Sequence, residues 1–555
     1  MLNSKKKPNN NSFGFSETTK VSNKKQAKKL NQKLKEKLNE AMLLINQGKL
    51  VDAETIYRKI ISKGTESHIV YGNLASLCGT RGNTNEMISL LKQAIRIKPN
   101  YIGAHYNLGN AHKQQGNLKD AILSYKKALE LNPNYEDAHN NLGTIFLEQG
   151  NTNAAVISFQ NALRLNPKLT EAHYNLGNAL KENEDLDAAI ISFQKAIKFN
   201  PNFLDAHTNL AATLQEAGDI NAAITSFEKA LKLNSNYLET HHNLAHALLL
   251  NSNYEKGWLE YEYRFRNAKK LITPYANPII PQWHGESLKI GDKLLIISEQ
   301  GLGDTIQFMR YIPYLRKQGI DVSLCAQTKL HDLIIASDIT SNPLTPEQAN
   351  KITSGKKIPL LSLPLHLRVN QNNPIVTQRY IYSRNEFIMK WRNILSVEKK
   401  PIIGINWQGN PQAEKSNLKG RSIPLELFSK IAKTSHLKFL SLQKGFGSEQ
   451  LENCSFIDQF VSCQAQVNKT WNFLETAAII SNCDLVITCD TSIAHLAGGM
   501  NKKTWLLLKD IPDWRWGLKD DKTFWYPSMR LFRQKKRYNW EEVIERVSRI
   551  LKKEI

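Results

Sequence analysis

The stretch GNLKDAILSYKKALELNP, residues 116–133, combines a helical spacing of apolar residues with a glycine before it and an Asn-Pro break after it. Apolar side chains that recur every three to four residues cover one face of a helix, and Gly and Pro are typical of its two ends. Close copies of this stretch fill the first half of the chain. The stretch therefore decides the fold of that half.

Asparagine marks the register of the repeat, because it recurs every 34 residues at positions 73, 107, 141, 175, 209 and 243. Leucine follows each asparagine, and alanine and proline recur at the same interval further along each unit. Each unit is predicted to be a helix, a turn and a second helix. One such pair cannot bury its apolar faces alone, so we expect the units to stack into a superhelix with a concave groove.

This pattern resembles the tetratricopeptide repeat, whose series of Leu-Gly, aromatic, Ala, Phe, Ala and Pro is almost intact between Asn107 and Pro201. One departure is histidine at positions 105, 139, 173, 207 and 241, where the family often has tryptophan. We predict about seven repeats over residues 34–267. The histidines do not predict a metal site, since equivalent residues one repeat apart lie far beyond the ~2.0–2.1 Å bonds of a shared zinc ion.

The asparagine column has two interpretations. Its side chains can both donate and accept hydrogen bonds, so a row of them can hold an extended peptide by its backbone. The same ladder occurs in the repeat-bearing O-linked N-acetylglucosamine transferases, which these units resemble. This interpretation predicts an acceptor or peptide groove lined by Asn107, Asn141, Asn175, Asn209 and Asn243. The alternative is that each asparagine only bridges adjacent helices.

The second half of the chain alternates short apolar runs with amphipathic segments, and the 34-residue phase ends near Leu271. Such alternation favours parallel sheets with helices on both faces. After a proline-rich linker over residues 268–292, we predict two Rossmann-like lobes over 293–390 and 391–555. Ligands of such sheets bind beyond the carboxyl ends of the strands. Three loops qualify, at residues 300–304, 408–421 and 490–492.

The loop GLGD, residues 301–304, lacks the third glycine and the distal acid of a dinucleotide fingerprint, so an NAD enzyme is not expected. The segment CDTSIAHLAGG, residues 489–499, ends a strand and opens a short helix, whose free N–H groups and hydroxyls could hold a diphosphate. A plain N-cap by Thr491 or Ser492 is the alternative. In KGRS, Lys419 and Arg421 could neutralise a phosphate.

Two longer segments carry a family resemblance. DLVITCDTSIAHLAGGMNKKTW, residues 484–505, resembles the carboxyl-lobe signature of heptosyltransferase-like enzymes of glycosyltransferase family 9, and SEQGLGDTIQFMRYIPYLRKQG, residues 298–319, resembles their amino-lobe opening. The pairing with repeats, together with DIPDWRWGLKDDKTFWYPSMRLFRQ at 510–534, is similar to bacterial repeat–glycosyltransferase fusions. The likeness covers nearly all of residues 281–540.

The resemblance implies a GT-B fold of two Rossmann-like lobes, with a sugar nucleotide as co-substrate and neither metal nor other cofactor. By position, Asp304 matches the acid that deprotonates the acceptor hydroxyl. Arg421 matches a basic phosphate ligand, although heptosyltransferases commonly have lysine there. The residues that match the nucleotide-binding segment are Asp490, Thr491, Ser492 and His495. The residues that end neighbouring strands, and are expected to line the same pocket, are Gln408, Gly409, Asn410 and Gln443.

The charge and the cysteine content of the chain indicate its expected partners and cellular location. The net charge is +23, and the first forty residues hold eleven lysines and only three acids. We interpret residues 1–33 as a basic disordered tail and do not expect nucleic-acid binding, although such a tail can attract polyanions or a membrane surface. Six cysteines without a CxxC pair indicate reduced thiols and a cytoplasmic protein. No apolar run reaches the ~20 residues of a membrane span, and no apolar segment follows the basic start as in a secretory signal.

The sequence as a whole predicts a glycosyltransferase that moves a sugar from a sugar nucleotide to an acceptor hydroxyl, with the repeats recruiting a protein acceptor or partner. The alternative is a catalytically inactive repeat scaffold with a transferase-like domain. The donor sugar, the stereochemical outcome and the class of acceptor (protein, lipid or polysaccharide) stay open.

Overall fold

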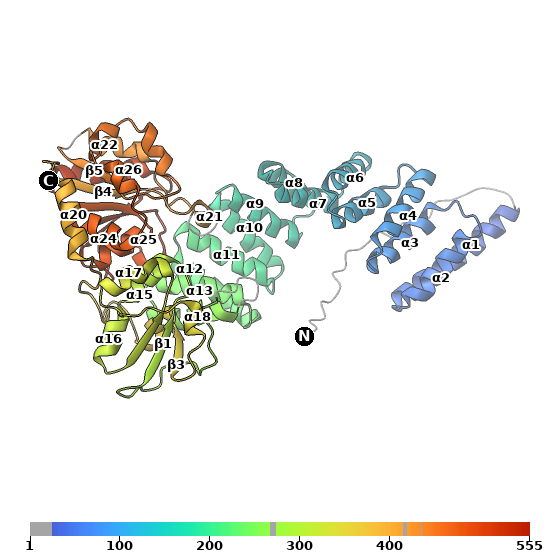
Figure 1. The fold of residues 1–555 in the computed structure, drawn as a ribbon. Helices are drawn as coiled ribbons and strands as arrows, with labels where there is room; N and C mark the ends of the chain where they lie inside the picture. Colours follow the sequence, from blue (N-terminus) through green and yellow to red (C-terminus); the bar gives the residue numbers. More distant parts are fainter. Residues whose placement is uncertain (1–24, 267–272, 415–418, 434–435, 555) are drawn as a thin grey trace. The chain divides into compact units, whose positions relative to one another are not determined.

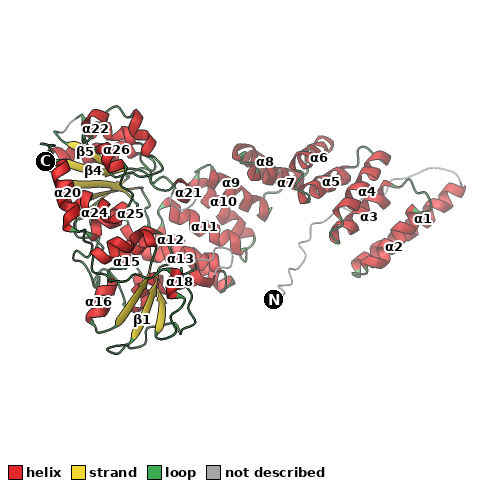
Figure 2. Cartoon of the chain, in the orientation of Figure 1, coloured by secondary structure: helices red, strands yellow, loops and turns green. Residues whose placement is uncertain are grey.

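The structure, a computed structural model, describes residues 25–266, 273–414, 419–433 and 436–554. The chain divides into two compact units between Thr213 and Leu214. The first unit is helical, and the second combines helices with two sheets (Figure 1, Figure 2).

The first unit is a superhelix of repeated helix pairs, in which successive helices pack within and between repeats. Its helices are α1 Lys25–Asn46, α2 Leu50–Ile61, α3 His68–Thr80, α4 Thr84–Ile97, α5 Ile102–Gln114, α6 Leu118–Leu131, α7 Glu136–Glu148, α8 Thr152–Leu165, α9 Thr170–Glu182 and α10 Leu186–Phe199, with α11 Leu204–Ala217 crossing into the second unit. Helix α1 begins inside the predicted disordered tail, so that prediction is wrong for residues 25–33, and residues 1–24 lie outside the described part.

Glycine follows the leucine in three of the repeats, and close helix packing explains it there. A Cβ on Gly109 would lie 2.6 Å from the Tyr125 ring, and equivalent positions meet Phe159 and Phe193. These rings are fully buried. In these repeats glycine lets the second helix approach the first closely, whereas buried alanines hold the same position in the others, at 75, 211 and 245.

The histidine column links each helix to the break before it. His105 Nε2 lies 2.8 Å from the Pro99 carbonyl oxygen. The same contact recurs at His139, His173 and His207, at 2.9–3.0 Å from the carbonyls of the matching prolines. Histidine therefore fills the tryptophan position of the family and adds a hydrogen bond that satisfies an otherwise unpaired carbonyl at the helix end.

The amino sheet of the second unit is parallel, with strand order β2-β1-β3 and bounds β1 Lys293–Ile297, β2 Asp321–Cys325 and β3 Lys356–Pro359. Strand β3 falls in a stretch without clear periodicity and was not predicted. The helix expected after GLGD is two helices, α15 Leu302–Phe308 and α16 Tyr311–Lys317. Pro313 favours this break, because it cannot donate the next helical hydrogen bond. The remaining helices are α17 His331–Ala336, α18 Pro346–Ala349, α19 Leu363–His366 and α20 Asn385–Leu395.

The carboxyl sheet is also parallel, with strand order β5-β4-β6-β7-β8. Its strands are β4 Ile402–Asn406, β5 Lys438–Ser441, β6 Leu485–Cys489, β7 Thr504–Leu508 and β8 Met529–Arg533. The associated helices are α21 Pro411–Glu414, α22 Ser429–Ala432, α23 Gln464–Asn468, α24 Phe473–Ser481, α25 Ser492–Gly499 and α26 Trp540–Glu554. The predicted cap of the last helix is confirmed, since Asn539 Oδ1 accepts from the Glu542 N–H at 3.2 Å.

The last repeat belongs to the second unit, in which it packs against the amino sheet. It comprises α12 Ile220–Leu233, α13 Leu238–Leu250, α14 Tyr254–Tyr261 and the 3-10 turn η1 Glu262–Arg266. Arg264 Nη2 donates to Glu299 Oε1 at 2.9 Å and to Ser362 Oγ at 2.8 Å. Arg264 and Glu299 are only 2% and 6% exposed. The predicted boundary between repeats and lobes at 267–268 is therefore not a packing boundary.

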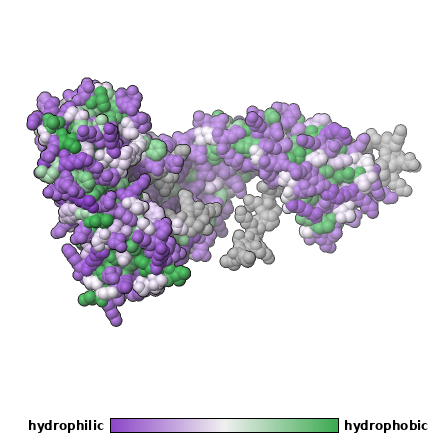
Figure 3. Space-filling model, in the orientation of Figure 1, coloured by the Kyte–Doolittle hydropathy of each residue, from purple (hydrophilic) through white to green (hydrophobic). Residues whose placement is uncertain are grey.

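Hydrophilic residues cover most of the face drawn in Figure 3, with apolar residues scattered among them. Within the described ranges, none of the helices has the length and apolar character that crossing a membrane requires.

Removing one member of the buried pair tests its structural role. Arg264→Met leaves the Glu299 carboxylate buried without its cation, which is expected to destabilise the protein by about 3–5 kcal/mol. Denaturant unfolding measures the loss. The exposed Arg266 on the same turn is the matched control, and Arg266→Met should change stability little. An equal effect of the two substitutions would contradict the role of the buried pair.

Candidate functional site

The predicted site loops lie at the carboxyl ends of parallel strands. One loop follows β1, and the other two follow the neighbouring strands β4 and β6, which are paired through Asn406 and Thr488. The β1 loop meets the β6 loop where α15 packs on α25. A Cβ on Gly303 would lie 2.9 Å from His495 Cδ2 and 3.5 Å from Ser492 Cα. Residues from both sheets therefore share one site.

Asp304 lies in the first turn of α15 and is 19% exposed. Its Oδ2 accepts a hydrogen bond from the Gly301 N–H at 3.0 Å, so the acid caps the helix. Its Oδ1 forms an ion pair with Arg515. Burial raises the pKa of Asp304, and the Arg515 guanidinium opposes that rise. The side chain is thus both a cap and a partly solvent-accessible carboxylate of the site.

Arg515 was not predicted as a site residue, and its three guanidinium nitrogens are all engaged. Besides the contact with Asp304, its Nη1 donates to Asp513 Oδ1 at 2.8 Å and its Nε donates to Gln307 Oε1 at 2.7 Å. Burial acts to raise the pKa of Asp513, but the charge and the hydrogen bonds of Arg515, together with His246, hold that pKa below the usual value. Arg515 lies in the segment 510–534, which was quoted only for its family resemblance. The spacing of the residues around it does not indicate a function.

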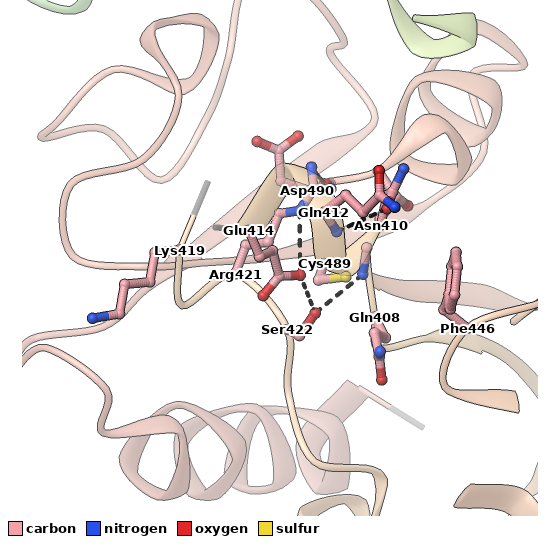
Figure 4. A network of polar contacts seen from close by, with 12 residues as sticks. Gln408, Asn410, Gln412, Glu414, Lys419, Arg421, Ser422, Phe446, Cys489 and Asp490 are labelled. Atoms are coloured by element: carbon pink, nitrogen blue, oxygen red, sulfur yellow. Dashed lines mark hydrogen bonds and ion pairs between the residues drawn. The ribbon is translucent and has the colours of Figure 1, made fainter. Parts of the chain in front are cut away.

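Arg421 lies where the loops after β4 and β6 meet (Figure 4). Its Nη1 donates to the Asp490 carbonyl oxygen at 3.1 Å, and its Nε lies 3.6 Å from Glu414 Oε1. A Cβ on Gly409 would lie 2.3 Å from the guanidinium, so the glycine makes room for it. The structure brings together Arg421, Gly409 and Asp490, whose nucleotide-binding role stays a prediction.

Gln443 ties two of these loops together and has no free amide group. Its Oε1 accepts from Asn406 Nδ2 at 2.6 Å and from the N–H groups of Trp407 and Gln408 at 3.2 and 3.0 Å. Its Nε2 donates to the carbonyls of Gln408 and Phe446 at 3.1 and 2.6 Å. The prediction that Gln443 lines the pocket is therefore wrong, because it is a buried support for the loops.

Three other predicted residues point away from Arg421 (Figure 4). The Gln408 side chain accepts from Gln450 Nε2 at 2.8 Å, and Asn410 Oδ1 accepts from the Gln412 N–H at 3.0 Å within its own turn. Lys419 Nζ lies 5.9 Å from the centre of the Tyr538 ring. These residues shape the edge of the site and do not converge with Arg421.

Phe446, which the sequence did not single out, is the exposed aromatic residue of this edge. It is 60% exposed and lies on the loop after β5 (Figure 4). Gly445 and Gly447 on either side have positive φ angles of 67° and 84°, a conformation that favours glycine. The Phe446 carbonyl oxygen accepts from Gln443 Nε2 at 2.6 Å, which anchors the loop while the ring stays exposed.

At the amino end of α25, Thr491 is the N-cap residue, but its hydroxyl does not cap the helix. It donates instead to Asn406 Oδ1 at 2.7 Å, so the plain-cap interpretation of Thr491 is not supported. Ser492 is partly exposed beside it. His495 is buried, with Nδ1 2.9 Å from the Tyr526 hydroxyl and its ring stacked on Trp516. Burial lowers the pKa of His495 to about 3, so it is a neutral packing residue.

Asp490 is a second acid of the site whose pKa is raised. Burial and the nearby negative charge of Asp513 raise its pKa to about 6, while the Arg421 cation opposes the shift. Charges that shift the pKa of a neighbour in this way typically lie within ~4–6 Å of it. Asp490, Asp513 and Asp304 thus form one electrostatic cluster with Arg421 and Arg515.

The asparagine column joins neighbouring repeats, as the alternative interpretation predicts. Asn141 Nδ2 donates to the Tyr106 hydroxyl at 3.1 Å and to Asn110 Oδ1 at 3.0 Å, both in the preceding repeat. Asn209 and Asn175 donate to the preceding repeat in the same way. Asn107 is buried, whereas Asn141, Asn175, Asn209 and Asn243 keep partial exposure. The peptide groove stays a prediction.

Across the described ranges, no three His, Cys, Asp or Glu side chains gather closely enough to hold a metal ion.

Comparison with known families identifies the repeats. A TPR repeat model matches residues 80–116, 109–150, 143–184 and 213–252, and tetratricopeptide repeat models match 170–203 and 192–225. Residues 80–252 are therefore tetratricopeptide repeats.

Among curated proteins, the chain is similar to the protein FlbA of Caulobacter vibrioides. The two are 24% identical over 331 residues, which cover 55% of this chain and 53% of FlbA. The chain thus spans about half the length of this relative.

Solved structures that resemble the chain are repeat proteins. YrrB, described as a TPR protein with an unusual peptide-binding site, is 24% identical, with a TM-score of 0.31 over 34% of this chain and 96% of YrrB. The C-terminal part of a repeat protein from Cytophaga hutchinsonii is 17% identical, with a TM-score of 0.36 over 42% of this chain and 97% of that one.

The raised pKa of Asp490 predicts a pH-dependent stability. A group with a raised folded pKa stabilises the fold fully below its unfolded pKa, ~3.9. That stability is lost as the pH rises through about 6. Asparagine does not titrate, so Asp490→Asn does not lose this stability as the pH rises. From pH 5 to pH 8 its free energy of unfolding should therefore rise by on the order of 1 kcal/mol relative to that of the wild type.

Urea unfolding at the two pH values measures this difference. Asp521→Asn, at a mostly exposed acid on the same lobe, is the control and should leave the pH dependence unchanged. Parallel pH profiles for wild type and Asp490→Asn would show that Asp490 titrates normally.

Proposed function

We propose that this chain is a glycosyltransferase of GT-B architecture that moves a sugar from a sugar nucleotide to an acceptor hydroxyl. The observation that supports it most is the convergence of Asp304, Arg421 and the amino end of α25 at the carboxyl ends of two parallel sheets. The two sheets match the lobes that the resemblance to glycosyltransferase family 9 implies. Sugar nucleotides bind at this edge in open α/β folds.

The carboxyl lobe would hold the diphosphate of the donor. The open N–H groups at the start of α25 and the Arg421 guanidinium, which lies on the Asp490 carbonyl, favour a negative charge there. As the bond between the sugar and the diphosphate breaks, the same groups would stabilise the charge on the departing nucleoside diphosphate.

The amino lobe would supply the base. Asp304 takes the proton of the acceptor hydroxyl while the acceptor oxygen attacks the anomeric carbon, and the nucleoside diphosphate leaves with the electron pair of the broken bond. Each oxygen of a carboxylate has room for a second hydrogen-bond donor, so the contacts with Gly301 and Arg515 leave Asp304 able to bind an acceptor hydroxyl.

The repeats would recruit a protein acceptor or partner. The amide N–H groups of their asparagines donate to the preceding repeat, which orients the side-chain oxygens for peptide N–H groups. A protein acceptor is thereby favoured over a lipid or polysaccharide.

The rival candidate is an inactive scaffold that binds a nucleotide without transferring a sugar. The engagement of Asp304 by both Gly301 and Arg515 favours this alternative, because an acid that caps a helix and forms an ion pair also serves a purely structural role. The two candidate functions differ in whether Asp304 acts as a base in sugar transfer.

Asp304→Asn is expected to keep the affinity for the nucleoside diphosphate and to lower sugar transfer by at least ~100-fold, since general bases contribute ~10²–10⁴. Transfer is followed by nucleoside diphosphate release from a panel of sugar nucleotides, with cell extract as acceptor, and affinity by calorimetry. Asp332→Asn, at an exposed acid in the first turn of α17, is the control for loss of a helix-terminal charge. Unchanged turnover in Asp304→Asn would rule out the base.

The exposed ring of Phe446 predicts a nucleobase contact. Phe446→Ala should weaken binding of ADP, GDP or UDP, whichever the wild type prefers, by about 10-fold, since stacking of a base on an aromatic side chain is worth ~1–3 kcal/mol. Inorganic pyrophosphate, which has no base, should bind equally to both proteins in the same calorimetric assay.

Trp471→Ala is the matched control for this experiment, because Trp471 is another exposed aromatic residue of the carboxyl lobe, at 71%. It should leave both affinities unchanged. If Phe446→Ala weakened pyrophosphate binding as much as nucleotide binding, the loop would act on the phosphates and not on the base.

A further inference from the structure

The segment Asp513–Trp516 contacts three parts of the second unit through three consecutive residues. The Trp514 ring meets Trp258 of the last repeat edge to face, with centroids 5.2 Å apart. The Arg515 guanidinium reaches Asp304 of the amino lobe. The Trp516 ring stacks on His495 of α25 at 5.4 Å. This segment therefore joins the last repeat, the candidate base and the helix at the diphosphate site.

The central residue of the segment is held firmly. Arg515 is 8% exposed, and each of its three guanidinium nitrogens has its own oxygen, on Asp304, Gln307 and Asp513. The guanidinium carbon also lies 4.2 Å from the centre of the buried Trp514 ring and 5.8 Å from that of Phe308, so aromatic side chains pack around the ion pair. The contact with Asp304 is thus a fixed feature of the site.

We propose that Arg515 is a positioning residue, which aims the Asp304 carboxylate at the acceptor hydroxyl and keeps it ionised. The inference rests on the proposed function and adds a residue for which the family pattern assigns no role. Arg515 holds one oxygen of Asp304, and Gly301 holds the other, so the plane of the carboxylate is set by the two contacts.

The charges around Asp304 show why a cation is needed there. Burial raises the pKa of Asp304, the negative charge of Asp513 raises it further, and Arg515 opposes both. The other groups that face this cluster are Tyr261 from α14, His246 from α13, and Asp490 and His495 from the carboxyl lobe. Burial lowers the pKa of His246 to about 3, so it brings no positive charge. Arg515 is the cation in direct contact with Asp304.

The role of Arg515 follows from the balance of the transfer step. The acceptor O–H bond breaks and its proton goes to Asp304. The acceptor oxygen bonds to the anomeric carbon, and the diphosphate leaves with the electrons of the bond it loses. Asp304 must therefore be ionised before the step, and Arg515 itself neither gains nor loses a proton.

The experiment is the pH dependence of kcat/KM for the sugar nucleotide that the wild type turns over. Activity rises as Asp304 loses its proton, so the acid limb of the profile reports the pKa of Asp304 in the free enzyme. Arg515→Met should move this limb upward by about 1–3 pH units, the usual effect of removing an adjacent opposite charge. Arg515→Lys keeps the charge but not the geometry, and should move the limb less while still lowering kcat.

Arg530→Met is the control, since Arg530 lies on β8, pairs with Asp521 and is 41% exposed. It should leave the profile unchanged. Reduced rates in both Arg515 variants with the acid limb in its wild-type place would overturn the inference and leave Arg515 a structural role only. If Arg515→Met does not fold, the inference is tested by whether Arg515→Lys shifts the acid limb of the kcat/KM profile upward. A wild type that turns over no sugar nucleotide overturns the proposed function itself, which separates the two failures.

Discussion

The buried ion pair between Arg264 and Glu299 is the constraint on which the site depends. Glu299 follows β1 and precedes the loop that carries Asp304, while Arg264 closes the last repeat. Two charges without access to water are costly unless each is paired and hydrogen-bonded. Here Glu299 also accepts from the Leu361 N–H at 3.2 Å, and Ser362 accepts from Arg264. The position of the candidate base is thereby set from the repeat side as well as from its own strand.

In the candidate site, each of the two arginines lies beside carboxylate groups. Arg421 lies near Glu414, and Arg515 lies between Asp304 and Asp513. Asp490 has Arg421 on its carbonyl oxygen while its own carboxyl group is pushed toward the neutral form. If the proposed transferase function holds, an incoming diphosphate meets cations already held in place, so little reorganisation is needed at the moment of reaction.

Much of the fold can be predicted from local sequence patterns. The parts that cannot be predicted either lack a clear local pattern or depend on contacts with distant residues. The repeats are predictable because helix period, glycine and proline recur in phase, and the strands β1, β2, β4, β5, β6 and β7 because each is an apolar run between turn signals. Strand β3 escapes because Lys356 and Lys357 interrupt its apolar run. Asp304, Arg421 and Asp490 follow from the rule that loops after strands carry sites. Gln443 and Arg515 require tertiary structure, because most of their partners lie 35 or more residues away.

The integration of the last repeat also constrains how such a chain can vary. Upstream of Leu214, whole 34-residue units repeat the same internal contacts, such as the histidine bond to the preceding proline, so units can be gained or lost by recombination without disturbing a unique partner. The last repeat has no such freedom, because Arg264 and Trp258 are bonded to single residues of the amino lobe. Any exchange of repeat arrays between related proteins must therefore carry α12–α14 along with the sheets.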